Sequence, residues 1–113
     1  MDNRIYSLEK LNEIAQGDDV FVQELIITFI ETASEEIENM QKLMEVGDWK
    51  AIGKIAHKLA PNYAYMDSEP LYTLAVNIEK KIQKSDLAEI MEMTHQMYTD
   101  SLVLIDELRK IIK

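Results

Sequence analysis

The sequence predicts an all-α protein, an antiparallel up-down four-helix bundle with a short extra N-terminal helix. Apolar residues recur at spacings of three and four along nearly the whole chain, which is the period of amphipathic helices. The chain of 113 residues has only three glycines and two prolines, too few for the turns of a many-stranded fold. The breaks between its apolar stretches are short, and short connections favour antiparallel neighbours. The length indicates a single domain over residues 1–113.

Two helices are expected in the N-terminal part of the chain. Ser7 can cap a short helix over residues 8–15, and the Gly-Asp-Asp sequence at 17–19 ends it and offers a new cap. A long helix is expected over residues 20–46, which at about 1.5 Å per residue spans roughly 40 Å. Its predicted buried side consists of Phe21, Leu25, Phe29, Ala33, Ile37, Met40 and Met44.

The third helix is expected to begin at Trp49, after a Gly-Asp pair at 47–48 that ends the long helix and caps the next. Pro61 has no N–H to bond the carbonyl of His57, so we expect a kink on the solvent side of this helix. Met66 stays in phase with the apolar stripe, which predicts that the helix continues past the proline. The predicted buried stripe consists of Ile52, Ile55, Ala56, Leu59 and Tyr63.

Two more helices complete the predicted bundle. Proline is tolerated in a first turn, so the Asp-Ser-Glu-Pro sequence at 67–70 predicts a helix from about Glu69. The Ser-Asp pair at 85–86 is expected to cap the last helix. The predicted buried side of the fourth helix is Leu71, Leu74, Ala75, Ile78 and Ile82. That of the last helix is Leu87, Ile90, Met91, Thr94, Met97, Tyr98, Ser101, Ile105, Leu108 and Ile112.

Composition and charge exclude several classes of function. The chain has no cysteine, so a disulfide framework and a thiolate metal site are both excluded. Without an apolar run of about 18 residues or a signal peptide, we expect a cytoplasmic protein with no membrane partner. The net charge of −9 opposes binding to nucleic acid. Residues 49–84 nevertheless carry six basic and three acidic side chains, either as a solvated helix face or as a local site for an anion.

His57 is the candidate functional residue. It lies off the buried stripe of its helix, and we expect its ring to be exposed among small residues and lysines. Gly53 lies inside the same helix, where a glycine destabilises the helix by about 1 kcal/mol relative to alanine. The close approach of a partner would explain why a glycine is present there. The alternative is an ordinary surface histidine beside an incidental glycine. The residues predicted to share its face are Lys50, Gly53, Lys54, Ala60, Pro61 and Ala64. Together with Lys58 they form the predicted phosphate or partner surface.

Other chemistry has weaker support in the sequence. Glu92 and His95 have the Glu-x-x-His spacing of di-iron bundles, but such sites need a second copy and two further glutamates. Lys54 occupies the matching position before His57, so we expect no metal site and a surface or boundary role for His95. The chain shows no set of nucleophile, base and acid and no Gly-rich phosphate loop. A lone exposed histidine then indicates a side chain that is itself covalently modified, with a partner later removing the modifying group.

Three segments resemble the histidine-containing phosphotransfer (HPt) domain. They are the Gly-Asp-Trp sequence at 47–49, the Ile-Ala-His-Lys-Leu helix at 55–59 and the Ser-Glu-Pro-Leu helix start at 68–71. The resemblance extends from about Asp18 to the end of the chain, and it includes the long second helix and the order of the helices after it.

The chain also departs from the usual motif of this family, which reads His-x-Leu-Lys-Gly with a further glycine ten residues after the histidine. His57 and Leu59 match it. Ala60 and Pro61 replace the usual lysine and glycine, and Asp67 replaces the later glycine. This form resembles a variant branch of the family. Lys58 or Lys54 is a candidate to replace the missing lysine.

The resemblance implies that His57 accepts a phosphoryl group from a receiver-domain aspartate and passes it to another receiver. The unperturbed pKa of histidine, about 6.5, leaves a neutral nucleophile at cytosolic pH. The receiver would supply Mg²⁺, so we expect no cofactor on this chain and no independent enzymatic turnover. The expected partners are response-regulator receiver domains and/or a hybrid histidine kinase, with the chain itself monomeric. It would be a separate protein or the cytoplasmic C-terminal part of a hybrid sensor kinase. The alternative is a helical module that binds a receiver or kinase without being phosphorylated.

Overall fold

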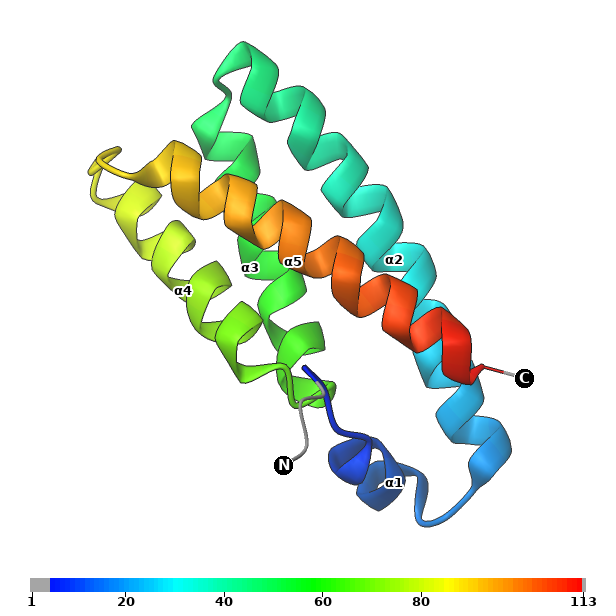
Figure 1. The fold of residues 1–113 in the computed structure, drawn as a ribbon. Coiled ribbons are helices and arrows are strands. Elements are labelled where there is room, and N and C mark those ends of the chain that lie inside the picture. The colour runs from blue at the N-terminus through cyan, green and yellow to red at the C-terminus, as the bar shows by residue number, and fades with distance from the viewer. Residues whose placement is uncertain (1–4, 113) are drawn as a thin grey trace.

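The computed structural model describes residues 5–112, which contain five α-helices in sequence order (Figure 1). The outermost residues of the predicted domain, 1–4 and 113, lie outside this range. Helices α2 to α5 form a four-helix bundle, and the short α1 precedes it, so the predicted fold class is confirmed. The helices are α1 (Glu9–Ala15), α2 (Asp19–Val46), α3 (Trp49–Tyr65), α4 (Glu69–Gln83) and α5 (Ile90–Ile111).

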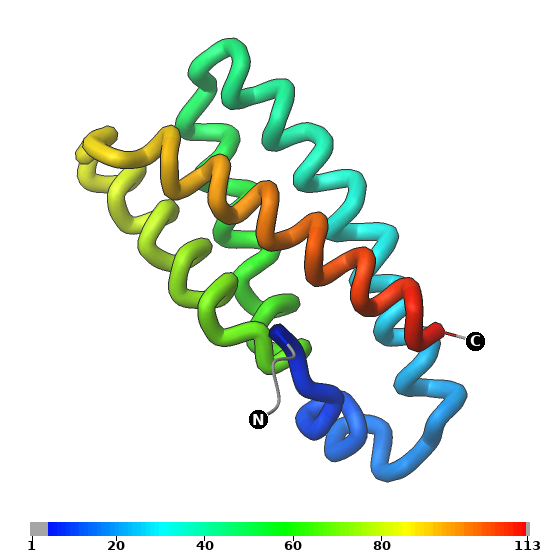
Figure 2. The backbone as a smooth tube through the Cα atoms, viewed as in Figure 1, coloured from blue at the N-terminus to red at the C-terminus, as the bar shows by residue number. Residues whose placement is uncertain are grey.

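Consecutive long helices run in opposite directions and are joined by short turns (Figure 2). Helix α3 packs most extensively against α4, and α5 closes the bundle by contacting both α2 and α4. Helix α1 lies below the bundle in Figure 1, near the start of α2 and the end of α3. None of the described helices is long and apolar enough to cross a lipid bilayer.

Capping residues set most helix ends where the sequence predicted them. Asp18 accepts hydrogen bonds from the backbone N–H groups two and three residues later, at 3.1 Å each. Asp48 caps α3 in the same way at 3.1 Å, and Gly47 ends α2 in the left-handed region with a φ of 71°. Ser7 accepts the N–H of Glu9 at 3.2 Å, although α1 begins one residue later than expected.

Helix α3 continues through Pro61 to Tyr65, as predicted, and the buried Met66 follows its last residue. The next residue, Asp67, has a φ of 53°, in the left-handed region that favours glycine. This backbone conformation explains why the usual motif has a glycine at this position. Aspartate is among the residues that tolerate the same conformation. Lys10 of α1 lies 3.1 Å from the Asp67 carboxylate.

The start of α5 differs from the prediction. The helix begins at Ile90 rather than near Leu87, because residues 84–89 form a turn in which two non-glycine residues have positive φ. Asp86 does not cap the helix. Its carboxylate accepts the N–H two residues later at 3.3 Å and pairs with Lys81, which also holds the pKa of Asp86 below its usual value.

The predicted buried side of α2 was wrong at its N-terminal end. Phe21 is 42% exposed, whereas Val22 is 4% exposed. The predicted stripe ran back from the buried Phe29 in steps of four residues, and each step shifts the position by about 40° around the helix. Residue 21 therefore lies about 80° around the helix from Phe29, whereas residue 22 lies only about 20° away. The residues of α2 that are buried are Val22, Ile26, Phe29, Ile30, Ala33, Ile37 and Met40.

The buried sides of the later helices are closer to the predictions. All five residues predicted for α3 are buried, and those predicted for α4 are buried or partly buried in the core. On α5, Met91 is 50% exposed although it was expected inside, and the fully buried Leu104 was not predicted. The buried residues of α5 are Ile90, Thr94, Met97, Ser101, Leu104, Ile105 and Leu108.

Tyr63 connects three helices in the core. Its ring meets Phe29 of α2 edge-on, with 6.1 Å between the ring centroids and 68° between the planes. Its hydroxyl is hydrogen-bonded to that of Ser101 on α5 at 2.6 Å, which satisfies both buried polar groups. Burial raises the pKa of Tyr63 to about 12, and the hydrogen bond with Ser101 opposes this shift more weakly.

Gly53 lies where α3 packs on α4. A Cβ atom added to Gly53 would be 3.2 Å from Cγ2 of Ile82, tighter than an ordinary van der Waals contact. Gly53 is buried, so the prediction that it stands open beside His57 for a partner is wrong. Close packing between the two helices explains the glycine.

Replacing Gly53 with leucine should lower the free energy of unfolding by about 1–3 kcal/mol, because the new side chain cannot fit against Ile82 without separating the helices. Urea denaturation followed by circular dichroism measures this. The matched control is Lys54→Leu, which adds the same side chain at the neighbouring exposed position. Equal stability of the two variants would contradict the packing role of Gly53.

Tyr63→Phe should cost about 1–3 kcal/mol at neutral pH, because the Ser101 hydroxyl stays buried without a partner. The pKa of Tyr63, about 12 when folded against 10.0 ordinarily, also makes stability depend on pH. Above the ordinary pKa the folded state keeps a proton that the unfolded chain has lost, so wild-type stability falls as pH rises. Urea titrations from about pH 9 to about pH 12 should therefore show the difference between the two proteins shrinking. A constant difference would exclude the raised pKa.

Candidate functional site

His57 lies on the outer side of α3, and 77% of its side chain is exposed. It is two residues from the buried Ile55 and Leu59, so it points about 200° around the helix from each of them. The predicted exposure of the ring is confirmed. The imidazole is therefore accessible to another molecule without any rearrangement of the core.

Glu79 of α4 holds one nitrogen of this exposed ring. Nδ1 of His57 lies 2.8 Å from Oε2 of Glu79, and the other carboxylate oxygen accepts a hydrogen bond from Gln83 at 3.3 Å. An ionised carboxylate can only accept, so Nδ1 carries the hydrogen in this contact. In a neutral ring, Nε2 then has the free lone pair. The contact selects one tautomer and leaves the other nitrogen with an unshared electron pair that faces no protein partner in this contact.

Glu79 was not among the residues predicted for this site. It is 22 residues from His57 and on a different helix, so no spacing rule connects the two residues. One signal was present, since Glu79 is one of three acidic residues in the basic stretch 49–84. It also follows Ile78, which is fully buried, and this places it at the edge of the face that α4 turns toward the bundle.

The lysines near His57 have different surroundings. Lys58 donates a hydrogen bond to Glu36 of α2 at 2.8 Å, and this carboxylate raises the pKa of Lys58. It is thus engaged on the side of α3 that faces α2. Lys50 and Lys54 are exposed, and neither has an ion-pair partner within the described residues 5–112.

Two open grooves flank the His57–Glu79 pair. Both are lined by residues of α3 and α4, and the first also by residues of the turn after α4. The first, here called the lysine groove, has a volume of about 770 Å³ and is lined in part by Trp49, Lys50, Gly53, Lys54, Ile82 and Leu87. The second, the tyrosine groove, has about 520 Å³ and is lined in part by Ala60, Pro61, Ala64, Tyr65, Tyr72 and Val76. The lysine groove thus offers two lysines, whereas the tyrosine groove offers two phenol groups and one lysine, Lys80.

The residues predicted to surround His57 differ in their exposure. The structure brings Lys50, Lys54, Pro61 and Ala64 to the grooves beside the ring. Gly53 and Ala60 are buried instead of exposed, and Ala60 is only 7% accessible. Both are rotated from His57 toward α4, by about 40° and 60°, so the neighbouring helix covers them. They form the floors of the grooves rather than an open surface.

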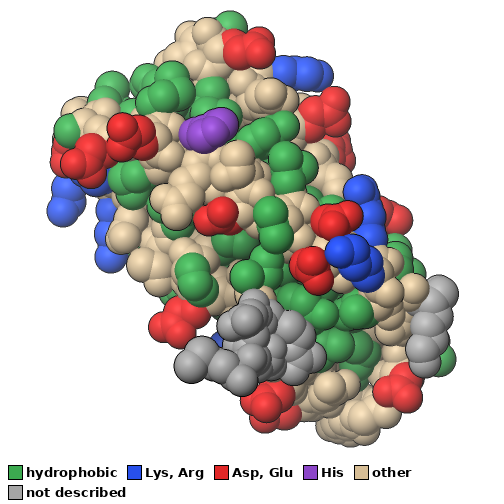
Figure 3. All heavy atoms as spheres, viewed as in Figure 1, with side chains coloured by type: hydrophobic (Ala, Val, Ile, Leu, Met, Phe, Trp, Pro, Cys, Tyr) green, Lys and Arg blue, Asp and Glu red, His purple; other side chains and the backbone are tan. Residues whose placement is uncertain are grey.

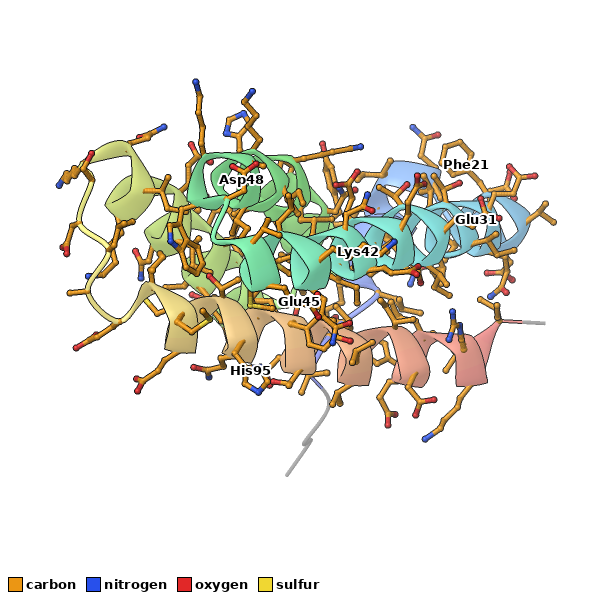
Figure 4. All side chains as sticks on the ribbon, turned by 90° about the horizontal axis from the view of Figure 1, so that it is seen from above. Phe21, Glu31, Lys42, Glu45, Asp48 and His95 are labelled. Carbon is orange, nitrogen blue, oxygen red and sulfur yellow. The ribbon has the colours of Figure 1, made fainter. Side chains whose placement is uncertain are left out.

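His95 lies apart from this site. Figure 4 shows it on α5, pointing away from the bundle, and it is exposed. Figure 3 shows the face that α5 crosses, where acidic side chains are scattered among apolar ones. Within the part of the chain that the structure describes, no three His, Cys, Asp or Glu side chains gather closely enough to hold a metal ion.

Comparison with known proteins adds sequence relatives. The Hpt domain family model matches residues 24–111. The virulence sensor protein BvgS of Bordetella bronchiseptica is 27% identical over 106 residues, covering 92% of this chain and 9% of that protein. BvgS of Bordetella parapertussis is 28% identical over 78 residues, covering 69% of this chain and 6% of that protein. The chain spans less than a tenth of the length of these curated relatives.

A solved structure has the same fold. The histidine-containing phosphotransfer protein B (HptB) of Pseudomonas aeruginosa PAO1 is similar with a TM-score of 0.81 and 15% sequence identity, over 96% of this chain and 95% of that one. The family model covers well over half of the chain and includes the whole of α3 and α4. The chain therefore belongs to the family of Hpt domains, the histidine-containing phosphotransfer domains that carry phosphoryl groups in phosphorelays.

Proposed function

We propose that His57 is the phosphorylated residue, which accepts a phosphoryl group from a receiver-domain aspartate and passes it to another receiver. One observation carries this proposal. The His57 ring is 77% exposed, yet its Nδ1 is held by Glu79 at 2.8 Å, so the ring is accessible and oriented at the same time. An ordinary surface histidine needs no such contact.

The transfer step follows from this geometry. The lone pair of Nε2 attacks the phosphorus of the receiver's aspartyl phosphate. An N–P bond forms while the P–O bond to the aspartate breaks, and the aspartate leaves as a carboxylate. The ring keeps its Nδ1 hydrogen and gains positive charge, which the Glu79 carboxylate balances at 2.8 Å. A second receiver aspartate attacks the phosphoryl group in the reverse step, and His57 is restored.

The receiver supplies what this chain lacks. In the proposal it brings Mg²⁺ and most of the charge stabilisation, so the chain acts as a carrier without turnover of its own. Lys54 takes the place of the usual lysine, because it lines the lysine groove beside His57 whereas Lys58 is bound to Glu36. The exposed positive charges of this groove favour the acidic pocket of a receiver.

The setting of the carrier is part of the proposal. The Bordetella relatives are named as sensor proteins, which supports a partner in a sensory pathway, either a receiver domain or a hybrid histidine kinase. We place the carrier in the cytoplasm and expect it to act as a monomer, either as a separate protein or as part of a hybrid kinase.

His57→Gln should abolish phosphoryl acceptance and leave the fold intact, because the ring is exposed. The measurement is transfer of labelled phosphate from phosphorylated receiver domains of the source organism, followed by acid and base treatment. Acid should remove the label and base should spare it. The matched control His95→Gln should label like the wild type. A labelled His57→Gln variant would refute the assignment, and a folded wild type that accepts no label from any receiver would favour the alternative, an interaction module without phosphorylation.

Glu79→Ala should slow transfer roughly tenfold, because the ring loses its fixed orientation. Glu79→Gln keeps an oxygen that can accept from Nδ1 and should recover part of the rate. Nitrogen NMR of the imidazole tests the cause directly. The wild type should show the hydrogen on Nδ1, and Glu79→Ala should shift the tautomer toward Nε2. Unchanged tautomer populations in Glu79→Ala would show that Glu79 does not position the ring.

A further inference from the structure

Helix α1 and the residues just before it contact the end of α3, the helix that carries His57. They precede residue 24, where the match to the Hpt family model begins. The Ser7 N–H donates to the carbonyl of Met66 at 2.9 Å, and Tyr6 is 7% exposed. Leu11 of α1 is 2% exposed, so the helix is anchored by apolar burial as well.

Lys10 makes the polar contacts between α1 and this end of α3. Its ammonium group donates to the carbonyl of Ala64 at 3.2 Å and lies 3.1 Å from the carboxylate of Asp67. The last carbonyls of a helix lack partners within the helix, and a cation there is favourable. Pro61 also removes one hydrogen bond from the preceding turn. The Ala64 carbonyl already accepts the N–H of Asp67 at 3.1 Å, so Lys10 adds a second, charged donor at the end of this helix.

The same end of α3 forms a wall of the tyrosine groove beside His57. Ala64 and Tyr72 line that groove, and they also line a smaller cleft that Lys10 and Asp67 border. A continuous surface therefore connects His57 with Lys10. The position of the Ala64 backbone, which Lys10 holds, affects the shape of the groove.

We propose that α1 is a clasp, in which Lys10 is a positioning residue that holds the last turn of α3 in the shape on which a receiver docks. The inference rests on the proposed function, because it assigns docking to the surface beside His57. When a docking surface is only partly populated in its binding shape, the apparent affinity falls by that fraction. Loosening the clasp should therefore weaken docking, while the chemistry of His57, nearly two turns earlier in α3, stays the same.

The test measures transfer from a phosphorylated receiver over a range of receiver concentrations. Lys10→Glu removes the donor and repels Asp67, so the half-saturating receiver concentration should rise about three- to tenfold. The rate at saturation should not change. Lys10→Arg keeps the charge and the donors and should restore docking. The matched control Lys42→Glu makes the same charge change at an exposed position of α2 and should have no such effect.

Two further measurements separate this inference from the proposed function. Labelling of His57 by phosphoramidate, a small donor, needs no docking and should be equal in the wild type and Lys10→Glu. Hydrogen exchange needs no receiver and should be faster in Lys10→Glu at the amides of Met66, Asp67 and Ser68, which bond to the last turns of α3. An unchanged half-saturating concentration, unchanged exchange or a loss of phosphoramidate labelling would each overturn the clasp. Failure of every receiver to label the wild type would instead count against the proposed function, and exchange would still decide whether the clasp exists.

Discussion

The packing of α3 on α4 is the contact on which the rest of the site depends. Gly53 allows the two helices to approach so closely that a methyl group would already press on Ile82. At this separation, Glu79 of α4 reaches the ring of His57 at 2.8 Å while most of the ring stays in solvent. A buried apolar contact thus determines an exposed polar one. The grooves on both sides of the ring have the same origin, since they lie along the line where these two helices meet.

The departures from the usual family motif are accommodated in this fold without disrupting α3. Ala60 stands where a lysine is usual, and here it is buried toward α4 and forms part of the floor of the tyrosine groove. Asp67 stands where a glycine is usual, and it keeps the left-handed backbone with a φ of 53° while pairing with Lys10. Pro61 leaves the helix intact as far as Tyr65. These substitutions change the chemistry around His57 while the fold of the family is retained.

Charge is divided between the two sides of α3. Lys58 lies about 100° around the helix from His57 and is bound to Glu36 of α2, so it is committed within the molecule. Lys50 and Lys54 line the groove next to the ring, where they can meet an acidic partner. The remainder of the chain is strongly acidic. Such a distribution favours approach of an acidic partner to the α3–α4 face and opposes its approach elsewhere.

By itself, the sequence determined the features that depend on local rules. The helix period, the caps at Asp18 and Asp48 and the exposed phase of His57 all follow from the arrangement of residues within a turn or two. Only the tertiary structure decided how far the covered side of α3 extends beyond the predicted apolar stripe. Gly53 and Ala60 flank His57 as closely as Lys54 and Pro61 do, and α4 buries only the first pair. It also decided that Glu79, Glu36 and Lys10 reach α3, because such contacts join residues 22 or more positions apart and depend on how the helices pack.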